Sequence, residues 1–253
     1  MKPLLEARGV SKSYGAFHAL EGVSIEVREG ELLSLVGQNG AGKTTLVNLL
    51  TGLMAPTKGE IFFLGANIAG VSAVALAERG LARAFQPIAI FPKLTVGQTI
   101  SAAIVSRQGK RWRVLSRLCA DQAVAGSVRH IAEIFGLEHR LDVVSEGLSQ
   151  GEKKLLDAAS AFALEPQVIL LDEPTSGVAT ADKYRIMDTL IEAARKSGVK
   201  SIMLVEHDMD LVAAYSDRII ALAEGRVLAD LPPDAFFADP AVVETVVGKR
   251  RAC

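Results

Sequence analysis

The stretch Gly37-Gln38-Asn39-Gly40-Ala41-Gly42-Lys43-Thr44-Thr45 stands between a strand-like apolar run, 32–36, and a helix-like run, 45–50. Its glycines allow a tight turn that aims several backbone N–H groups at one anion, and the following helix adds the positive end of its dipole. Lys43 supplies a point charge for the outer phosphates of a nucleotide, and Thr44 supplies a hydroxyl for a magnesium ion. The pattern therefore predicts a nucleotide site rather than an incidental glycine-rich turn. The residues assigned to the nucleotide are Gly37, Asn39, Gly40, Ala41, Gly42, Lys43, Thr44 and Thr45.

The composition of the chain narrows the class of protein. A chain of 253 residues, 49% of them hydrophobic, can bury a sizeable core. Its 28 Lys and Arg balance 29 Asp and Glu, so no global field draws it to nucleic acid, and no nucleic-acid partner is expected. Cys119 and Cys253 are the only cysteines, which favours a reducing compartment and excludes a disulfide framework. We expect neither a secretory signal nor a membrane span, because no long apolar run is free of charges.

The order of the apolar segments predicts an α/β fold. The expected strands of the first third, partly antiparallel, lie around 4–10, 23–27, 31–36 and 59–63. Solid apolar runs at 168–171 and 201–205 are typical of parallel strands covered on both faces, and two further strands are expected at 218–223 and 226–229. Helical periodicity lies between them. The predicted division is an α/β core with an N-terminal β subdomain over 1–94 and 165–230, a helical subdomain over 95–164 and a C-terminal tail over 231–253.

Two carboxylates follow the apolar run at 168–171. Asp172 is placed to hold magnesium directly or through water, and Glu173 is a candidate base for the water that attacks the γ-phosphate. The alternative is a capping pair before Pro174, because acids favour strand-to-helix turns. The phosphate-binding loop elsewhere in the chain favours the catalytic interpretation.

Three further side chains are candidate site residues. His207 follows another strand and can hydrogen-bond the γ-phosphate, although a histidine in a loop is often only solvated. Gln86 carries an amide that can contact magnesium or the attacking water. Tyr14 can stack on a purine, although an aromatic beside a glycine is more often simple packing.

The segment Leu148-Ser149-Gln150-Gly151-Glu152 opens a long helical run. Ser149 and Glu152 fit a capping box, and a helix cap alone would explain them. A glycine-containing helix start also presents N–H groups to an anion. Because the first such start already follows the phosphate loop, the second is expected to serve a nucleotide held mainly by another subunit.

Together, and in this order, these segments resemble the ATP-binding-cassette (ABC) ATPase family over nearly the whole chain. The matching segments are the Walker A loop at 37–45, the Q-loop at 85–86, the family-specific helix start at 148–152, the Walker B strand at 170–175, the switch histidine at 207 and the aromatic at 14. The resemblance implies ATP and Mg²⁺ as cofactors. It implies Glu173, His207 and Gln86 as catalytic residues and Thr44, Gln86 and Asp172 as metal ligands.

The resemblance also implies partners. ABC ATPases form head-to-tail dimers, so each ATP is expected between one subunit's Walker A loop and the partner's Ser149, Gln150 and Gly151. The segments 82–86, 91–96 and the short tail resemble the ATPases of branched-chain amino-acid importers, and the insert from about 106 to 121 resembles the larger of the two ATPases that such systems carry. This implies transmembrane permease subunits, indirectly a solute-binding protein, and a peripheral place on the cytoplasmic face of the inner membrane.

Two departures and one basic stretch remain. Ala179 stands where the family's D-loop usually has Asp or Asn, which puts communication between the two sites in doubt, and Gln150-Gly151-Glu152 replaces the commoner Gly-Gly-Gln. The basic stretch 107–113, with Trp112 and Arg117, is either a solvated helix face or loop with one packed aromatic, or a surface that faces the membrane or the coupling region of a partner.

The rival functions are a soluble cassette ATPase acting on nucleic acid or the ribosome, a regulatory module without turnover, and a P-loop phosphotransferase. Soluble cassette ATPases typically carry a second cassette or a long coiled coil, and this chain has neither. A regulatory module without turnover would predict loss of Glu173 or His207, and both are present. A phosphotransferase would leave the segment 148–152 unexplained.

Overall fold

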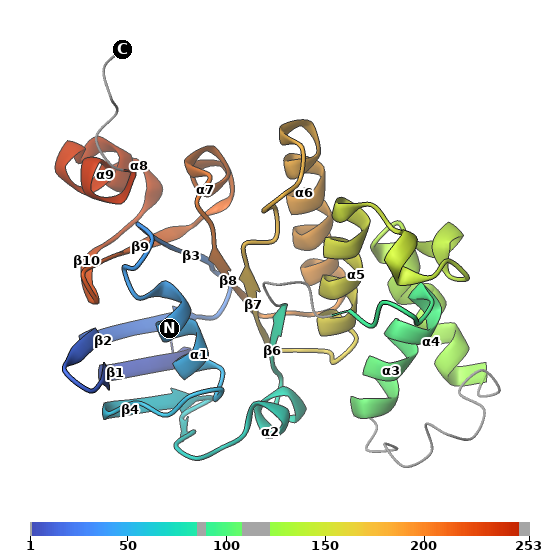
Figure 1. The fold of residues 1–253 in the computed structure, drawn as a ribbon, viewed down its shortest axis with the longest axis horizontal. Coiled ribbons are helices and arrows are strands. Elements are labelled where there is room, and N and C mark those ends of the chain that lie inside the picture. The colour runs from blue at the N-terminus through green and yellow to red at the C-terminus, as the bar shows by residue number, and fades with distance from the viewer. Residues whose placement is uncertain (1, 85–89, 108–121, 248–253) are drawn as a thin grey trace. The chain divides into compact units, whose positions relative to one another are not determined.

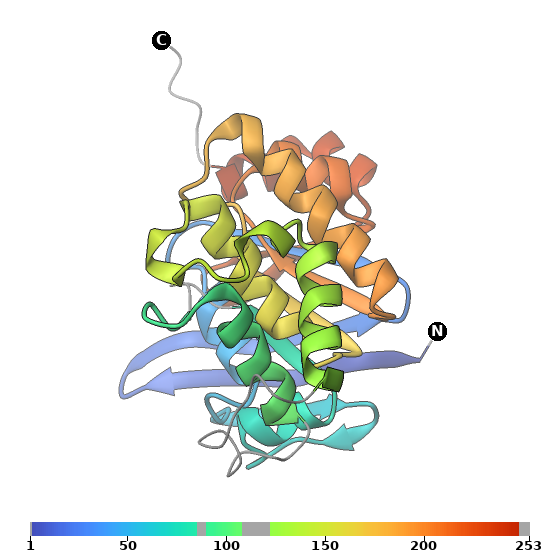
Figure 2. The same cartoon turned by 90° about the vertical axis from the view of Figure 1, so that its right-hand side faces the viewer.

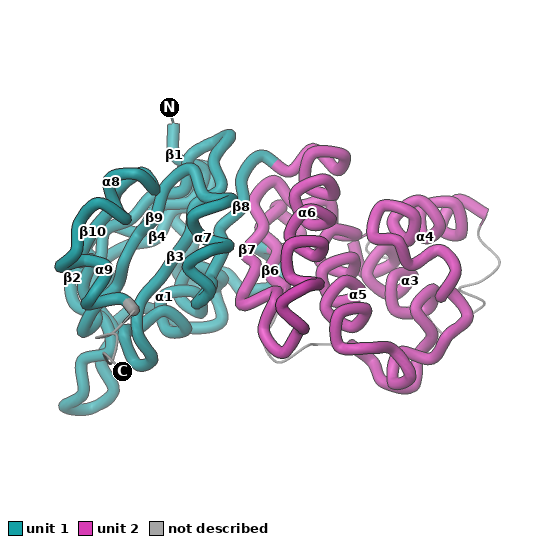
Figure 3. Tube along the Cα trace, turned by 90° about the horizontal axis from the view of Figure 1, so that it is seen from above, with its two compact units in different colours: residues 1–76, 200–253 teal, residues 77–199 magenta. Residues whose placement is uncertain are grey.

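A computed structural model describes residues 2–84, 90–107 and 122–247 (Figure 1). The chain divides into two compact units, with 1–76 and 200–253 in unit 1 and 77–199 in unit 2 (Figure 3). The domain boundaries expected from the sequence stay a prediction. Within the described part of the chain, no helix is both long enough and apolar enough to cross a bilayer.

Unit 1 contains an antiparallel sheet in the order β2-β1-β4-β5. Its strands are β1 (Pro3–Tyr14), β2 (Phe17–Arg28), β4 (Lys58–Phe63) and β5 (Ala66–Asn67). Inward positions of β1 such as Leu5, Ala7 and Val10 are buried. The antiparallel entry expected from the first third of the sequence is confirmed.

Unit 1 also contains three parallel strands with β3 (Leu32–Gly37) between β8 (Ser201–Val205) and β9 (Arg218–Ala223). All residues of β3 and β8 are buried, as expected for strands covered on both faces. β10 (Arg226–Leu231) returns antiparallel to β9 through the turn Glu224-Gly225, whose residues both have positive φ. Such a turn matches the twist of the two strands it joins.

The helices of unit 1 are α1 (Lys43–Leu50), α7 (Met209–Tyr215), α8 (Pro233–Ala238) and α9 (Pro240–Val247), and α2 (Ala73–Glu78) crosses the boundary between the units. Phe236 of α8 and Val246 of α9 pack in one buried cluster with Val36 and Ile219. The C-terminal helices therefore close the hydrophobic core beside the strand that leads into the phosphate loop.

Unit 2 pairs β6 (Leu81–Ala84) in parallel with β7 (Val168–Asp172). Its helices are α3 (Val96–Arg107), α4 (Gln122–Ile134), α5 (Gln150–Phe162) and α6 (Thr180–Lys196), with short 3₁₀ helices at Glu138–Arg140 and Ser145–Gly147. Figure 2 looks onto α3, α4 and α5, and Phe135 meets Phe162 edge to face at 5.3 Å between ring centroids. The predicted helical region is confirmed.

Two predicted features lie outside the described residues. Gln86 is one, and the basic stretch from 108 onward with Trp112 and Arg117 is the other. Arg107, the last described residue before this stretch, forms an ion pair with Glu165.

Candidate nucleotide site and its supports

The phosphate loop joins β3 to α1 in unit 1, as the sequence predicts. β3 ends at Gly37 and α1 begins at Lys43, so the loop is a strand-to-helix connection with its strand fully buried. Within α1, which is described throughout, no acidic side chain lies in the first turn. The positive end of the helix therefore faces no carboxylate of its own turn that would compete with a bound anion.

Two glycines of this loop are required by the chain's own packing. Gly37 has φ 152°, and a Cβ there would lie 2.4 Å from the carbonyl oxygen of Leu222. Gly42 has φ 104°, and its Cβ would lie 2.8 Å from the carbonyl oxygen of Ala19. A side chain at either position would displace backbone, so these glycines fix the path of the loop.

Lys43 is folded into the loop that it serves. Its side chain is buried, and Nζ donates to the carbonyl oxygens of Gly37 at 2.7 Å and Gln38 at 3.0 Å. The neighbouring Thr44 is exposed. The loop thus holds a cation in its centre and a hydroxyl at its surface, which suits a phosphate group and its magnesium ion.

The loop is supported by a turn that the sequence analysis did not connect with it. The N–H of Gly225 donates to the carbonyl oxygen of Ala41 at 3.1 Å, and the carbonyl oxygen of Gly225 accepts from Glu21 at 2.8 Å. The side chain of Gln38 donates to the carbonyl oxygen of Thr245 in α9 at 2.7 Å. A cavity of about 230 Å³ lies between these segments and is lined by residues 38–41, 222–224 and 245.

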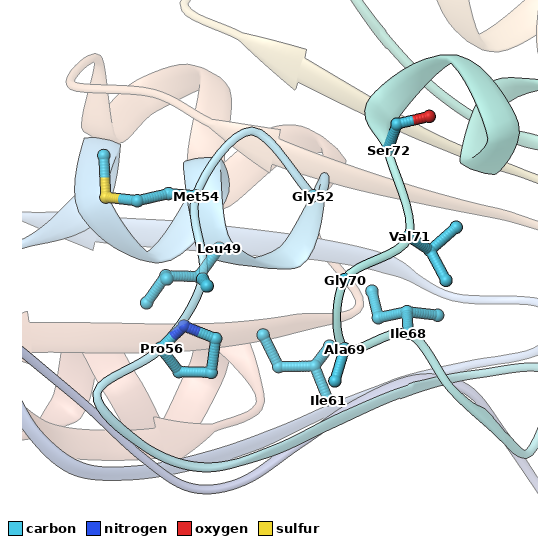
Figure 4. A pocket seen from close by; sticks show the side chains of 11 residues that line it. Leu49, Gly52, Met54, Pro56, Ile61, Ile68, Ala69, Gly70, Val71 and Ser72 are labelled. Carbon is cyan, nitrogen blue, oxygen red and sulfur yellow. The ribbon is translucent and has the colours of Figure 1, made fainter.

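A second cavity of unit 1 is smaller, about 150 Å³, and lies away from the phosphate loop (Figure 4). Its lining comes from the end of α1, from β4 and from the segment that leads into α2. The labelled side chains are almost all apolar, with Ser72 as the polar exception. Met54 at its edge accepts a hydrogen bond from the Tyr14 hydroxyl at 2.8 Å.

Tyr14 and His207 also belong to unit 1. Tyr14 ends β1 and is 49% exposed, and Nζ of Lys12 lies over its ring at 5.4 Å from the ring centroid. His207 follows β8 and is exposed, and its backbone N–H donates to the Glu206 carboxylate at 3.0 Å. Their roles toward a nucleotide stay predictions.

The carboxylate end of β7 belongs to unit 2 and is held by side chains. Asp172 is buried, and its Oδ2 accepts a hydrogen bond from Nη2 of Arg83 at 2.5 Å. The two side chains are only 8% and 6% exposed. Arg83 lies on β6 opposite Leu170 of β7, so strand pairing delivers its guanidinium to the end of the neighbouring strand. No local sequence pattern pointed to this partner of Asp172.

Glu173 has a backbone conformation that ordinary residues avoid. Its φ is 50°, in the left-handed region, which costs about 1–2 kcal/mol for a residue with a side chain. Such strain persists where neighbouring groups hold it, and it gathers at functional sites. Its carbonyl oxygen accepts from the Ser176 N–H at 3.2 Å and from Nζ of Lys154 at 2.8 Å. Lys154 is the second support that the sequence analysis missed.

The predicted capping box at the start of α5 is confirmed. The Ser149 hydroxyl accepts from the Glu152 N–H at 3.2 Å, and the Glu152 carboxylate accepts from the Ser149 N–H at 2.9 Å. The hydrogen bond from the Ser149 N–H, aided by Arg140, holds the pKa of Glu152 below its ordinary value. Ser149 and Gln150 are exposed.

Gly151, inside this helix start, differs from the glycines of the phosphate loop. Its φ is not positive, and a Cβ there would lie 3.7 Å from the side chain of Ile186, an ordinary contact. Within the residues that the structure describes, neither conformation nor packing therefore requires a glycine at this position.

A buried strand, a glycine loop around a lysine and a helix that starts at this loop define a P-loop nucleotide-binding domain of the α/β class. At the level of family, residues 20–176 match the ABC transporter family, and the chain belongs to that family.

Relatives and solved structures of this family match nearly the full length of this chain. LivG of Salmonella typhimurium, described as a high-affinity branched-chain amino acid transport ATP-binding protein, is 32% identical over 98% of this chain and 99% of its own length. BraF of Pseudomonas aeruginosa, with the same description, is 30% identical over the same shares. The solved ADP conformation of MJ1267, an ATP-binding cassette of an ABC transporter, has a TM-score of 0.84 at 27% identity and covers 98% of this chain and 100% of its own.

Proposed function

We propose that this chain is the ATP-binding and ATP-hydrolysing subunit of a membrane importer for branched-chain amino acids or related small organic solutes. The observation that carries the proposal is a complete phosphate loop with buried Lys43, in a chain that aligns end to end with LivG. The alignment favours this function over a soluble ATPase acting on nucleic acid or the ribosome.

In the proposed site, the phosphate loop and the end of β7 have different tasks. Lys43 and the loop N–H groups hold the phosphates. The Thr44 hydroxyl and the Asp172 carboxylate offer oxygen ligands of the kind that Mg²⁺ prefers, and the bound ion would neutralise charge on the phosphates. Glu173 accepts the proton of the attacking water, and His207 and Gln86 orient that water. Tyr14 stacks on the adenine.

The proposed partner of this site is a second ABC ATPase subunit. Ser149, Gln150 and Gly151 of one subunit would meet the nucleotide held by the phosphate loop of the other. The exposed Ser149 and the glycine at 151, which packing against the described residues does not require, support this arrangement. Permease subunits and, through them, a solute-binding protein would complete the importer at the cytoplasmic face of the inner membrane.

The substitution Glu173→Gln tests the proposed chemistry. Removal of a general base is expected to lower the rate of ATP hydrolysis by a factor of about 10²–10⁴. ATP-dependent dimerisation, measured by light scattering, should survive or strengthen because the phosphate loop is untouched. Glu192→Gln, on the exposed surface of α6, is the matched control and should hydrolyse ATP at the parent rate. Parent-like turnover in Glu173→Gln would rule out the assigned base.

A second experiment tests the importer class. The chain, recovered from gently solubilised membranes, is expected to bring permease subunits with it, and its ATPase rate should not rise on addition of RNA or DNA. Stimulation by nucleic acid, with no permease recovered, would favour the soluble ATPase instead.

A further inference from the structure

Lys154 is a buried lysine that links the start of α5 to the end of β7. It lies five residues after the helix cap Ser149 and is 8% exposed. Lysine is rarely buried to this degree unless its charge is paired or hydrogen-bonded. Its Nζ donates to the carbonyl oxygen of Glu173 at 2.8 Å and to the Ser176 hydroxyl at 3.1 Å.

These contacts act on the strained residue of the site. The direction of the Glu173 side chain follows from its backbone angles, and φ there is 50°. Its carbonyl oxygen is held from two sides, by the Ser176 N–H of the same turn and by Lys154 from another helix. A charged donor makes the stronger of such hydrogen bonds. Lys154 is therefore placed to hold the carboxylate of Glu173 in one direction.

The same lysine connects two segments that the proposed dimer places against a partner subunit. α5 begins at the exposed Ser149, and Ser176 opens the segment that runs to Ala179, the position where this chain lacks the family's usual polar side chain. Ala179 is exposed and caps α6 without a side-chain hydrogen bond. A polar contact from that side chain is not available, whereas Lys154 bridges the two segments within one subunit.

We propose that Lys154 is a positioning residue that couples the partner-facing helix start at Ser149 to the backbone of Glu173 and to the Ser176 segment of the same subunit. The proposal rests on the proposed function, because it assigns Lys154 its effect through Glu173 as the base. Engagement of Ser149 by a partner's nucleotide then fixes α5, and α5 fixes Glu173 through Lys154.

The test compares Lys154→Met with Lys154→Arg and with Lys153→Met, the neighbouring lysine on the same helix. Loss of the charge-assisted hydrogen bond to the Glu173 carbonyl oxygen is expected to lower kcat for ATP hydrolysis about tenfold to a hundredfold in Lys154→Met. The KM for ATP should stay within about twofold, because the phosphate loop belongs to unit 1. Lys154→Arg, whose guanidinium can donate to both acceptors, should restore most of kcat. Lys153→Met should behave as the parent.

Ser176→Ala tests the hydrogen bond between Lys154 and the Ser176 hydroxyl separately. It removes one acceptor of Lys154 and leaves the Glu173 carbonyl, so kcat should fall by a smaller factor. In the double variant with Lys154→Met, the loss of the Ser176 hydroxyl should lower kcat by a smaller factor than it does in the parent, because its hydrogen bond with Lys154 is already gone. Independent, multiplying effects would contradict the link.

Parallel measurement of Glu173→Gln separates the two proposals. If Glu173→Gln loses hydrolysis while Lys154→Met keeps the parent kcat, the positioning role is wrong and the proposed function stands. A fall in kcat in Lys154→Met that comes with an equally large rise in KM for ATP, and that Lys154→Arg does not restore, would show a general structural role. That result would also overturn the inference. If Glu173→Gln hydrolyses ATP normally, both proposals fail together. The supporting result is a fall in kcat alone, restored by arginine.

Discussion

The phosphate loop of unit 1 and the end of β7 in unit 2 are built by different means. The loop is held mainly by backbone groups. Its glycine conformations fix the path of the chain, and its carbonyl oxygens accept hydrogen bonds from Lys43. At the end of β7, side chains from other segments hold the acidic residues, with Arg83 on Asp172 and Lys154 on the carbonyl oxygen of Glu173. The phosphate loop therefore depends on backbone conformation, and the end of β7 depends on hydrogen bonds from buried charged side chains.

The two regions are therefore vulnerable to different kinds of substitution. A Cβ is the damaging change in a region built from backbone, because it meets atoms that cannot move aside. Removal of a charged side chain is the damaging change at the end of β7, because it leaves a buried charge or a buried acceptor without its partner. Substitutions of each kind should therefore separate the two regions.

The largest effect on stability is expected for Arg83→Met. Breaking one side of a buried pair typically lowers the free energy of unfolding by about 3–5 kcal/mol. Urea denaturation followed by circular dichroism measures this change. Arg185→Met, which breaks an exposed pair with Asp182 on α6, is the matched control and should change it by less than about 1 kcal/mol. Equal changes in the free energy of unfolding in the two variants would show that the buried Arg83–Asp172 pair stabilises the fold no more than an exposed pair does.

Gly42→Ala is expected to rank next. The left-handed conformation and the approach to the carbonyl oxygen of Ala19 together should cost about 2–3 kcal/mol. Gly40→Ala is the control in the same loop, because φ there is 84° but no atom of the residues that the structure describes lies within 4 Å of an added Cβ. It should cost only the conformational part, about 1 kcal/mol. The same denaturation experiment ranks the two, and a reversed order would contradict the packing argument.

Ser149→Ala is expected to have a smaller effect. The loss of the side-chain cap of α5 should lower the free energy of unfolding by about 1 kcal/mol. Ser149→Thr retains a hydroxyl that can accept from the same N–H and should recover most of the loss. An unchanged midpoint of thermal unfolding in Ser149→Ala would show that the capping box does not stabilise the helix start.

The pH dependence of the capping box should give the smallest effect. The pKa of Glu152 in the folded chain lies below its ordinary value of 4.5 because its carboxylate accepts from the Ser149 N–H. A carboxylate with a lowered pKa stabilises the fold above the ordinary value and loses this contribution as pH falls through the folded pKa. The difference in thermal midpoint between the parent and Glu152→Gln should therefore be present at neutral pH and shrink below about pH 4.5. A difference that grows on acidification would contradict the sign.

The sequence predicted the phosphate loop well because all its parts lie within one short stretch. Glycines, lysine and threonine at fixed spacing report a local backbone shape, and the strand and helix on either side confirm it. The capping box of α5 was predictable for the same reason, since Ser149 and Glu152 are three residues apart.

The supports of the site were not predictable because they depend on tertiary contacts. Arg83 is 89 residues from Asp172, and only the pairing of β6 with β7 brings them together. Lys154 resembles any exposed lysine on a polar helix face until α5 packs near the end of β7. The Glu224-Gly225 turn was predictable as a hairpin, but its contact with Ala41 was not.

The central claim is that the loop around Lys43 binds ATP, and equilibrium binding of ATP to Lys43→Met tests it most directly. Lys58→Met, which removes an exposed lysine of β4, is the control. The loss of a charged donor to phosphate should weaken ATP binding about tenfold to a hundredfold in Lys43→Met and leave Lys58→Met unchanged. ATP affinity equal to that of the parent in a folded Lys43→Met would contradict the account.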